Sequence, residues 1–210
     1  MNESQTAENS AVQQLTFNQG MLGEWIMLTI ALVCISQFDL EISLLGDIGG
    51  ATSIVSGFAG AIIIYVLLWS TYQLPGYFMD DLRSHLTAIR AALVKMPNWQ
   101  LMVLALAAGI AEELLFRAVL QTWLVSEIGL YWGILAASMM FGLAHFISIP
   151  YVIVTALTGI GLGYLYAFTD SLMLVMIIHA VYDAIAFLVI CERPQWLNLA
   201  QPIQNISTQD

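Results

Sequence analysis

The stretch Ala111-Glu112-Glu113-Leu114-Leu115-Phe116-Arg117 lies inside an apolar run that covers residues 101–125. A charge at the centre of a bilayer costs at least ~2.5–3.5 kcal/mol, so charged residues there usually face the interior of a helix bundle and mark function. On a helix, Glu113 lies four residues before Arg117, which is the favourable order for an ion pair. Glu112 has no cation three or four residues away, and we therefore single it out as the candidate functional carboxylate.

The composition is that of a membrane protein. Of the 210 residues, 60% are hydrophobic and only 10% are charged, whereas a soluble domain carries about 25% charged residues. The 15 acidic and 5 basic residues give a net charge of −10, which argues against nucleic-acid binding because no basic patch can form. Cys34 and Cys191 lie in or at the end of apolar stretches and indicate no disulfide framework.

Six apolar segments approach the ~20 residues that a helix needs to cross the hydrocarbon core. They are Trp25–Leu45, Ala51–Tyr72, Trp99–Val125, Tyr131–Ser148, Tyr151–Phe168 and Ser171–Ile190. Very short breaks separate the last three segments, so we expect antiparallel neighbours there. In the fifth segment, Gly159, Gly161 and Gly163 form a small-residue face that favours close helix packing. The predicted fold class is all-α, a polytopic membrane helix bundle with about six transmembrane helices.

A further helix is predicted between the second and third spans, over Tyr77–Lys95. Its apolar residues recur at steps of three and four, and its charged residues fall largely on the other side. This pattern is typical of an amphipathic helix that lies in the membrane interface. A plain linker helix and a gate or guide for substrate are both open for this segment.

The same segments predict the organisation of the chain. Residues 1–20 are polar and contain no Lys or Arg, so they are not a signal peptide, and we expect a short disordered tail. Residues 21–96 hold the first two spans and the interfacial helix. Residues 97–193 hold a core of four helices, and residues 194–210 form a C-terminal tail.

The few basic residues predict how the chain is oriented. Arg83, Arg90 and Lys95 share one loop, and Arg193 follows the last span. With six spans these two places lie on the same side of the membrane, and basic loops favour the cytoplasm. We therefore expect an integral membrane protein with both termini in the cytoplasm.

The charged and histidine side chains within the predicted spans form one set, apart from Glu24 at the edge of the first span. The set consists of Glu112, Glu113, Arg117, His145, His179 and Asp183. Because hydrocarbon offers no hydrogen-bond partners, we expect these groups to gather in a single polar site between the third, fourth and sixth spans. Phe141 lies four residues before His145 and shares its helix face.

A glutamate with two histidines suits either a catalytic water or a metal such as zinc, with Glu112, His145 and His179 as the candidate metal ligands. The set does not suit a serine or cysteine protease, because Cys34 has no obvious base in its span and no Gly-x-Ser-x-Gly elbow is present. His179 and Asp183 could form a buried hydrogen bond, a metal-ligand pair, or an acid–base group with its orienting partner.

The predicted boundaries leave one conflict of depth. At 1.5 Å per residue, Glu112 lies ~20 Å from the cytoplasmic end of its span, whereas His145 lies only ~5 Å from the end of a span that runs to Ser148. Either the boundaries shift by several residues, or the segment Phe146–Val152 is not a simple loop.

The motifs Glu112-Glu113-x-x-x-Arg117, Phe141-x-x-x-His145 and His179-x-x-x-Asp183 resemble those of the CAAX prenyl protease and bacteriocin-processing (CPBP, or Abi) family of intramembrane proteases. Their order and their separation of about 33 residues are also similar, and the resemblance covers roughly residues 98–190. It implies four catalytic-core helices around a membrane-embedded site that opens toward the cytoplasm. It also implies hydrolysis of peptide bonds without a covalent intermediate.

By this resemblance, Glu112 is the general base that activates water, and His145 assists it. His179 and the residue at position 183 would hold the carbonyl oxygen as it becomes an oxyanion. Because an ionised Asp has no N–H to donate, we expect Asp183 instead to orient His179 or to help hold a metal. Glu113 and Arg117 are expected to form a supporting ion pair, with Phe141 as a further supporting residue.

The predicted function is that of a glutamate-dependent, or metal-dependent, intramembrane endopeptidase of the bacterial inner (plasma) membrane. Its substrates would be prenylated proteins or membrane-associated peptides such as bacteriocin leaders, and no cofactor beyond a divalent metal such as zinc is implied. Two alternatives remain open. One is an immunity or binding protein that keeps the fold without catalysis, and the other is a divalent-metal carrier or sensor.

Overall fold

The computed structural model describes residues 3–199, with side chains from Phe17 onward. Its long helices are α1 (Glu3–Phe38), α2 (Gly50–Thr71), α3 (Tyr77–Leu93), α4 (Asn98–Glu113), α6 (Leu130–Ala144), α7 (Ile149–Thr169) and α8 (Leu172–Glu192). A π-helix, Leu114–Gln121, joins α4 to the short helix α5, Thr122–Ile128, and short 3-10 helices cover Gly46–Ile48 and Pro194–Leu197. The described part of the chain contains no strand, and the predicted all-α class is confirmed.

Four helical segments within the described residues are long and apolar enough to cross a membrane. They are Phe17–Phe38, Gly50–Thr71, Ile149–Thr169 and Leu172–Glu192. The other two expected spans differ from these. α6 is apolar but has only 15 residues, and the helical stretch over residues 98–128 carries three buried charges and changes to a π-helix midway.

α1 differs from expectation at both of its ends. It begins at Glu3, so from that residue onward the structure describes a helix where residues 1–20 were expected to form a disordered tail. The reason lies in the composition, because residues 3–20 lack proline and contain several good helix formers. α1 ends at Phe38, seven residues before the expected end, because Asp39 adopts a left-handed conformation with φ of 48°.

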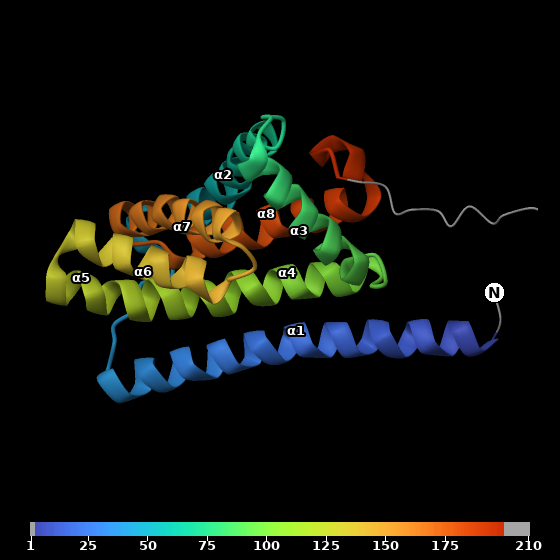
Figure 1. Cartoon of the computed structure of the whole chain (residues 1–210). Helices are drawn as coiled ribbons and strands as arrows, with labels where there is room; N and C mark the ends of the chain where they lie inside the picture. The colour runs from blue at the N-terminus through green and yellow to red at the C-terminus, as the bar shows by residue number, and fades with distance from the viewer. Residues whose placement is uncertain (1–2, 200–210) are drawn as a thin grey trace, which may run out of the picture.

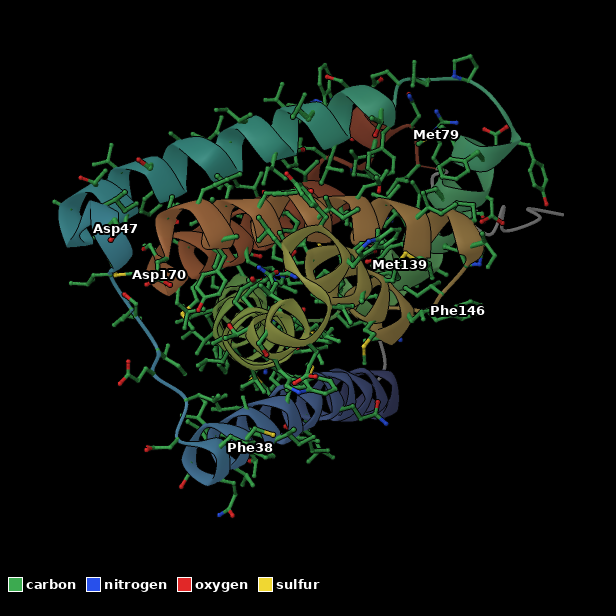
Figure 2. All side chains as sticks on the ribbon, turned by 90° about the vertical axis from the view of Figure 1, so that its left-hand side faces the viewer. Phe38, Asp47, Met79, Met139, Phe146 and Asp170 are labelled. Carbon is green, nitrogen blue, oxygen red and sulfur yellow. The ribbon has the colours of Figure 1, made fainter. Side chains whose placement is uncertain are left out.

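The loop after α1 fixes the start of α8. The backbone N–H of Met173 donates to the carbonyl oxygen of Leu44 at 2.9 Å, and the hydroxyl groups of Ser53 and Ser171 lie 2.9 Å apart. Figure 2 shows this loop, marked by Asp47, beside the α7–α8 turn. α8 is therefore anchored at one end of the bundle by contacts with the N-terminal part of the chain.

α1 and α2 lie on opposite sides of the remaining helices (Figure 2). α1 packs against α4 and the π-helix, α2 and α4 both pack against α8, and α6 packs against α7. The short turns in this last part of the chain produce the antiparallel neighbours that we expected (Figure 1). Large apolar side chains are exposed along the outer helices, as expected for contact with lipid, among them Leu22, Ile26, Val33, Val55, Phe58 and Leu67.

The conflict of depth at His145 disappears because α6 is shorter than predicted. It ends at Ala144 rather than Ser148, so its length is only roughly 22 Å at 1.5 Å per residue. His145 follows as the residue that caps its C-terminus, and the hydroxyl of Ser148 accepts a hydrogen bond from the N–H of Tyr151 in the first turn of α7. α6 and α7 consequently cover only one part of α4, and α3 crosses the other part (Figure 1).

α3 confirms the predicted amphipathic helix and closes one end of the bundle. Arg90 donates from Nε to the carbonyl oxygen of Ile190 at 2.9 Å, in the last turns of α8. Arg83 donates from Nη2 to the carbonyl oxygen of Tyr72 at 2.7 Å. The apolar face of α3 is buried together with Leu197 and Leu199, so the first residues of the expected C-terminal tail are packed. Residues 200–210 of that tail lie outside the described part.

α4 and α8 approach each other closely at Gly109. A Cβ atom at this position would lie 2.7 Å from both Cβ and the backbone nitrogen of Ala180. On α7, Gly159 and Gly163 make similar close contacts, whereas a Cβ atom at Gly161 would meet nothing within 4 Å. The small-residue face of α7 therefore consists of two of the three predicted glycines, because residues two apart lie on different sides of a helix.

We expect Gly109→Ala to lower the Tm of the protein in detergent, because the added methyl group forces α4 away from α8. Overpacking of this kind costs typically ~1–3 kcal/mol. Gly161→Ala is the matched control, since it makes the same change on a helix where space is open and should leave the Tm equal or higher. Equal Tm values for the two variants would contradict the close α4–α8 contact.

Candidate functional site

The predicted polar residues meet between α4, the π-helix, α6 and α8. The residues brought together are Glu112, Glu113, Arg117, Phe141, His145, His179 and Asp183. Every residue that sequence analysis assigned to the site therefore belongs to one cluster. The roles of the individual residues are a separate matter and stay predictions.

Glu113 makes the strongest contacts in the cluster. Its Oε2 accepts a hydrogen bond from Nε of Arg117 at 3.0 Å, and its Oε1 lies 2.7 Å from Nδ1 of His179. All three side chains are at most 2% exposed. Because Arg117 keeps Glu113 ionised, Nδ1 of His179 is the donor in this contact, and Nε2 is directed away from Glu113.

The contact between Glu113 and His179 was not predicted. We expected Glu113 only to pair with Arg117 and Asp183 to orient His179, but Glu113 makes the shorter contact with His179. Oδ2 of Asp183 lies 3.6 Å from Nε2 of His179, which is longer than a direct hydrogen bond. The spacing of four residues on one helix favoured Asp183, whereas a contact between α4 and α8 leaves no periodic sign in the sequence.

The π-helix begins directly after Glu113 and was not predicted. Segments of this kind are rare and are frequently found at functional sites. Here the π-helix buries Phe116, Arg117 and Gln121, and Arg117 is 0% exposed. The stretch contains no proline or glycine, so its sequence offers no sign of the change in hydrogen-bond pattern.

Phe141 packs against Arg117 and against both histidine rings. Its ring centroid lies 4.6 Å from that of His145 and 5.9 Å from that of His179. The guanidinium carbon of Arg117 lies 5.2 Å from the same centroid, which is the distance of a cation–π contact. Phe141 is fully buried and therefore holds both imidazole rings in place from behind.

The opposite side of the cluster faces a cavity of about 290 Å³, which Glu112, His145, His179 and Asp183 line. Oε2 of Glu112 lies 3.4 Å from Nε2 of His145 and 3.8 Å from Nε2 of His179. Nδ1 of His145 lies 2.8 Å from the carbonyl oxygen of Phe141, so this ring also directs Nε2 toward Glu112.

Glu112 is thus a buried carboxylate with one oxygen available. Its Oε2 has no hydrogen-bond partner among the described residues, although the side chain is only 4% exposed. Because Nε2 of His145 and Nε2 of His179 lie 3.4 and 3.8 Å from this oxygen, a water molecule does not fit between the atoms, but one on their cavity side can bridge Oε2 of Glu112 and Nε2 of His145. The arrangement can therefore hold and polarise a water molecule.

Beyond these four residues the cavity is mostly apolar, and it extends from the cluster to α2, α3 and the 3-10 helix before residue 198. Its apolar and aromatic walls include Tyr65, Trp69, Leu86, Ile89, Leu104 and Leu197. Two of these belong to α3, which is the segment for which a linker and a gate or guide were both open. Its contribution to the wall favours the second possibility, which stays a prediction.

Sequence analysis missed two residues that border the site. The ring of Tyr182 stacks on that of His179, with centroids 5.4 Å apart. Glu24 lines the same cavity, although we set it aside as lying at the edge of the first span. Because α1 begins at Glu3, Glu24 lies well inside the helix. A single acid in an apolar helix was the signal that could have found it.

The possible metal site finds no support in the geometry. The described residues contain no group of three or more His, Cys, Asp or Glu side chains placed to hold a metal ion. The expected ligands Glu112, His145 and His179 are close together, with both Nε2 atoms 3.4–3.8 Å from Oε2 of Glu112, but they do not form such a group.

Residues 94–185 match the protein family described as type II CAAX prenyl endopeptidase Rce1-like. The match includes all three motifs and runs from the end of α3 into α8. Neither the curated proteins nor the solved structures contain a match to this chain.

We expect Arg117→Met to destabilise the protein by ~3–5 kcal/mol, because it leaves Glu113 as a buried charge with only His179 beside it. The double variant Arg117→Met/Glu113→Gln removes both charges and should be more stable than Arg117→Met alone. Thermal unfolding of the wild type, both single variants and the double variant in detergent measures this coupling. Strictly additive effects of the two changes would contradict the buried ion pair.

Proposed function

We propose that the chain hydrolyses peptide bonds, with Glu112 as the general base. The match of residues 94–185 to the type II CAAX prenyl endopeptidase Rce1-like family, which the three motifs predicted, supports a membrane-embedded protease at the level of the family. The observation that carries the proposal is the buried, unpaired Oε2 of Glu112, which faces the Nε2 atoms of His145 and His179. A general base must lie within reach of the proton that it takes, directly or through one water.

In the proposed reaction, a water molecule lies on the cavity side of Glu112 and His145 and hydrogen-bonds to both. It loses a proton to Oε2 of Glu112 while its oxygen bonds to the carbonyl carbon of the substrate. The carbonyl oxygen becomes an oxyanion, and the tetrahedral intermediate then breaks its C–N bond. The leaving amine takes the proton from Glu112, which returns to its starting state without a covalent intermediate.

His179 is proposed to stabilise the oxyanion. When doubly protonated, its ring can donate from Nε2 to the oxyanion while Nδ1 stays bonded to Glu113. A fixed donor of this kind in a site that excludes water is worth ~2.7–4 kcal/mol of transition-state stabilisation. Asp183 is proposed to position His179 from the side of the cavity, where its Oδ2 lies 3.6 Å from Nε2.

The apolar walls of the cavity support a membrane-associated substrate. Aromatic and aliphatic side chains surround the charged cluster, and the outer helices expose apolar side chains toward lipid. We propose that the substrates are membrane-associated proteins or peptides of the prenylated or leader type. Hydrolysis would take place within the lipid bilayer, at a site that the substrate reaches from the end of the bundle where α3 lies.

We also propose that this end faces the cytoplasm of a bacterial cell, with the protein in the inner membrane. Arg83 and Arg90 bond to the ends of α2 and α8, and Arg193 follows α8, so basic residues are concentrated here. A reporter that is active only in the cytoplasm should be active when fused to either terminus. Activity of an extracytoplasmic reporter at both termini would contradict this orientation.

We expect Glu112→Gln to abolish proteolysis, because general-base catalysis contributes typically ~10²–10⁴-fold to the rate. The experiment compares the peptide termini in membranes and secreted fractions of cells that express the wild type, Glu112→Gln, His179→Ala or Glu127→Gln at equal levels. Glu127 is an exposed acid at the end of α5 and provides the matched control. New termini should appear only with the wild type and this control.

Identical termini in all four strains would contradict the protease function. If a host phenotype persisted in the Glu112→Gln strain, the immunity or binding protein considered above would then be favoured.

A further inference from the structure

We propose that Glu24 is a specificity-determining residue whose carboxylate binds a basic side chain of the substrate, lysine or arginine, near the scissile bond. This inference rests on the proposed function, since it names the substrate class of the same site. α1, which carries Glu24, lies outside the matched segment 94–185, so the family match does not account for this residue.

α1 presents Glu24 to the cavity through a close contact with α4. Gly20 lies one turn before Glu24 and lines the same cavity. A Cβ atom at Gly20 would lie 3.0 Å from Cδ1 of Leu104, so the two helices approach closely here. The Glu24 side chain is half-buried, and its Oε2 is inaccessible to solvent and has no hydrogen-bond partner among the described residues. A buried carboxylate oxygen without a partner is unfavourable, so a ligand that donates a hydrogen bond to it would be stabilised.

The charges that line the cavity do not balance. The lining contains the carboxylates Glu24, Glu112 and Asp183 together with two histidines, and none of the described lining residues is lysine or arginine. Three ionised carboxylates and two neutral histidines give a charge of −3, and protonation of both histidines still leaves −1. Arg117 does not line the cavity and is bonded to Glu113.

Glu24 is the carboxylate that the proposed reaction leaves free. Glu112 faces the two histidines, and Asp183 lies 3.6 Å from His179. Glu24 interacts electrostatically with this whole group but bonds to none of its members. In a site of low dielectric, an excess negative charge favours a cation on the ligand and disfavours an acidic one.

The lining of the cavity suits a long basic side chain better than a small cation. Leu104 and Ala108 line it between α1 and the cluster, and Tyr65 and Trp69 enter from α2. The methylene groups of lysine or arginine pack well on such apolar walls, with the charged end directed to a carboxylate. Aromatic faces add cation–π attraction. A basic side chain therefore finds both apolar and charged partners in one cavity.

The first test measures binding without catalysis. The proteins are Glu112→Gln and Glu112→Gln/Glu24→Gln in lipid nanodiscs, and the probes are a hydrophobic peptide with one central arginine and its citrulline counterpart. We expect the arginine peptide to bind about tenfold or more tightly than the citrulline peptide to Glu112→Gln, as one charge-assisted hydrogen bond provides. The ratio should fall to about 1 in the double variant.

The second test maps cleavage sites in a mixed peptide pool treated with the wild type, Glu24→Gln, Glu24→Lys and the control Glu127→Gln. The wild type and the control should cleave peptides that carry lysine or arginine at one fixed position relative to the scissile bond. Glu24→Gln should lose that preference through a higher KM for basic peptides, with kcat little changed. Glu24→Lys should prefer aspartate or glutamate at the same position.

The outcomes separate the inference from the function on which it rests. Equal binding of the arginine and citrulline peptides to Glu112→Gln would overturn the role of Glu24, whether or not the protein is a protease. An equal loss of cleavage for basic and neutral peptides in Glu24→Gln would overturn it as well. Cleavage that persists in the single variant Glu112→Gln would refute the proposed reaction. The binding experiment would then still test whether Glu24 binds a basic side chain.

Discussion

The buried chain of contacts from Arg117 through Glu113 to His179 is the constraint on which the site depends. It joins the π-helix, α4 and α8 in a region where water cannot solvate any of the three groups. Each group would be costly if left alone, so the helices are held in one register, and the helix packing at Gly109 must allow it. The same contacts turn His179 so that its Nε2 faces the cavity. In the proposed reaction, the same three side chains therefore serve both the packing of the helices and the orientation of His179.

Sequence patterns were sufficient to predict those features of the fold that depend on the spacing of nearby residues. Apolar runs located the helices within a few residues in α2, α3, α7 and α8, and the isolated charges located the cluster. The failures concern features that local spacing does not encode. The contact between Glu113 and His179 joins distant parts of the chain, and the π-helix is a change of backbone hydrogen bonding in an ordinary apolar stretch. The end of α6 was predicted four residues too late, at Ser148 instead of Ala144, because Phe146 and Ile147 continue the apolar pattern beyond the helix.

The part of the chain outside the family match builds much of the cavity. The matched segment supplies the charged cluster and its histidines, whereas α1, α2 and α3 supply an acid, aromatic rings and an aliphatic wall. In the proposed function, chemistry and recognition thus come from different parts of the sequence. Such a division allows the walls to change their preference for a ligand while the three motifs, and the contacts behind them, stay the same.

The shortness of α6 has a consequence for the bilayer itself. A helix of 15 residues is roughly 22 Å long, whereas the hydrocarbon core is about 30 Å thick. Lipids beside such a helix must tilt or compress, because the alternative is to leave the polar turn at His145 in contact with acyl chains. We therefore expect the membrane to be thinnest next to the α6–α7 turn. A thinner bilayer on that side brings bulk water closer to Glu112. The surrounding lipid thereby influences how easily water reaches the site.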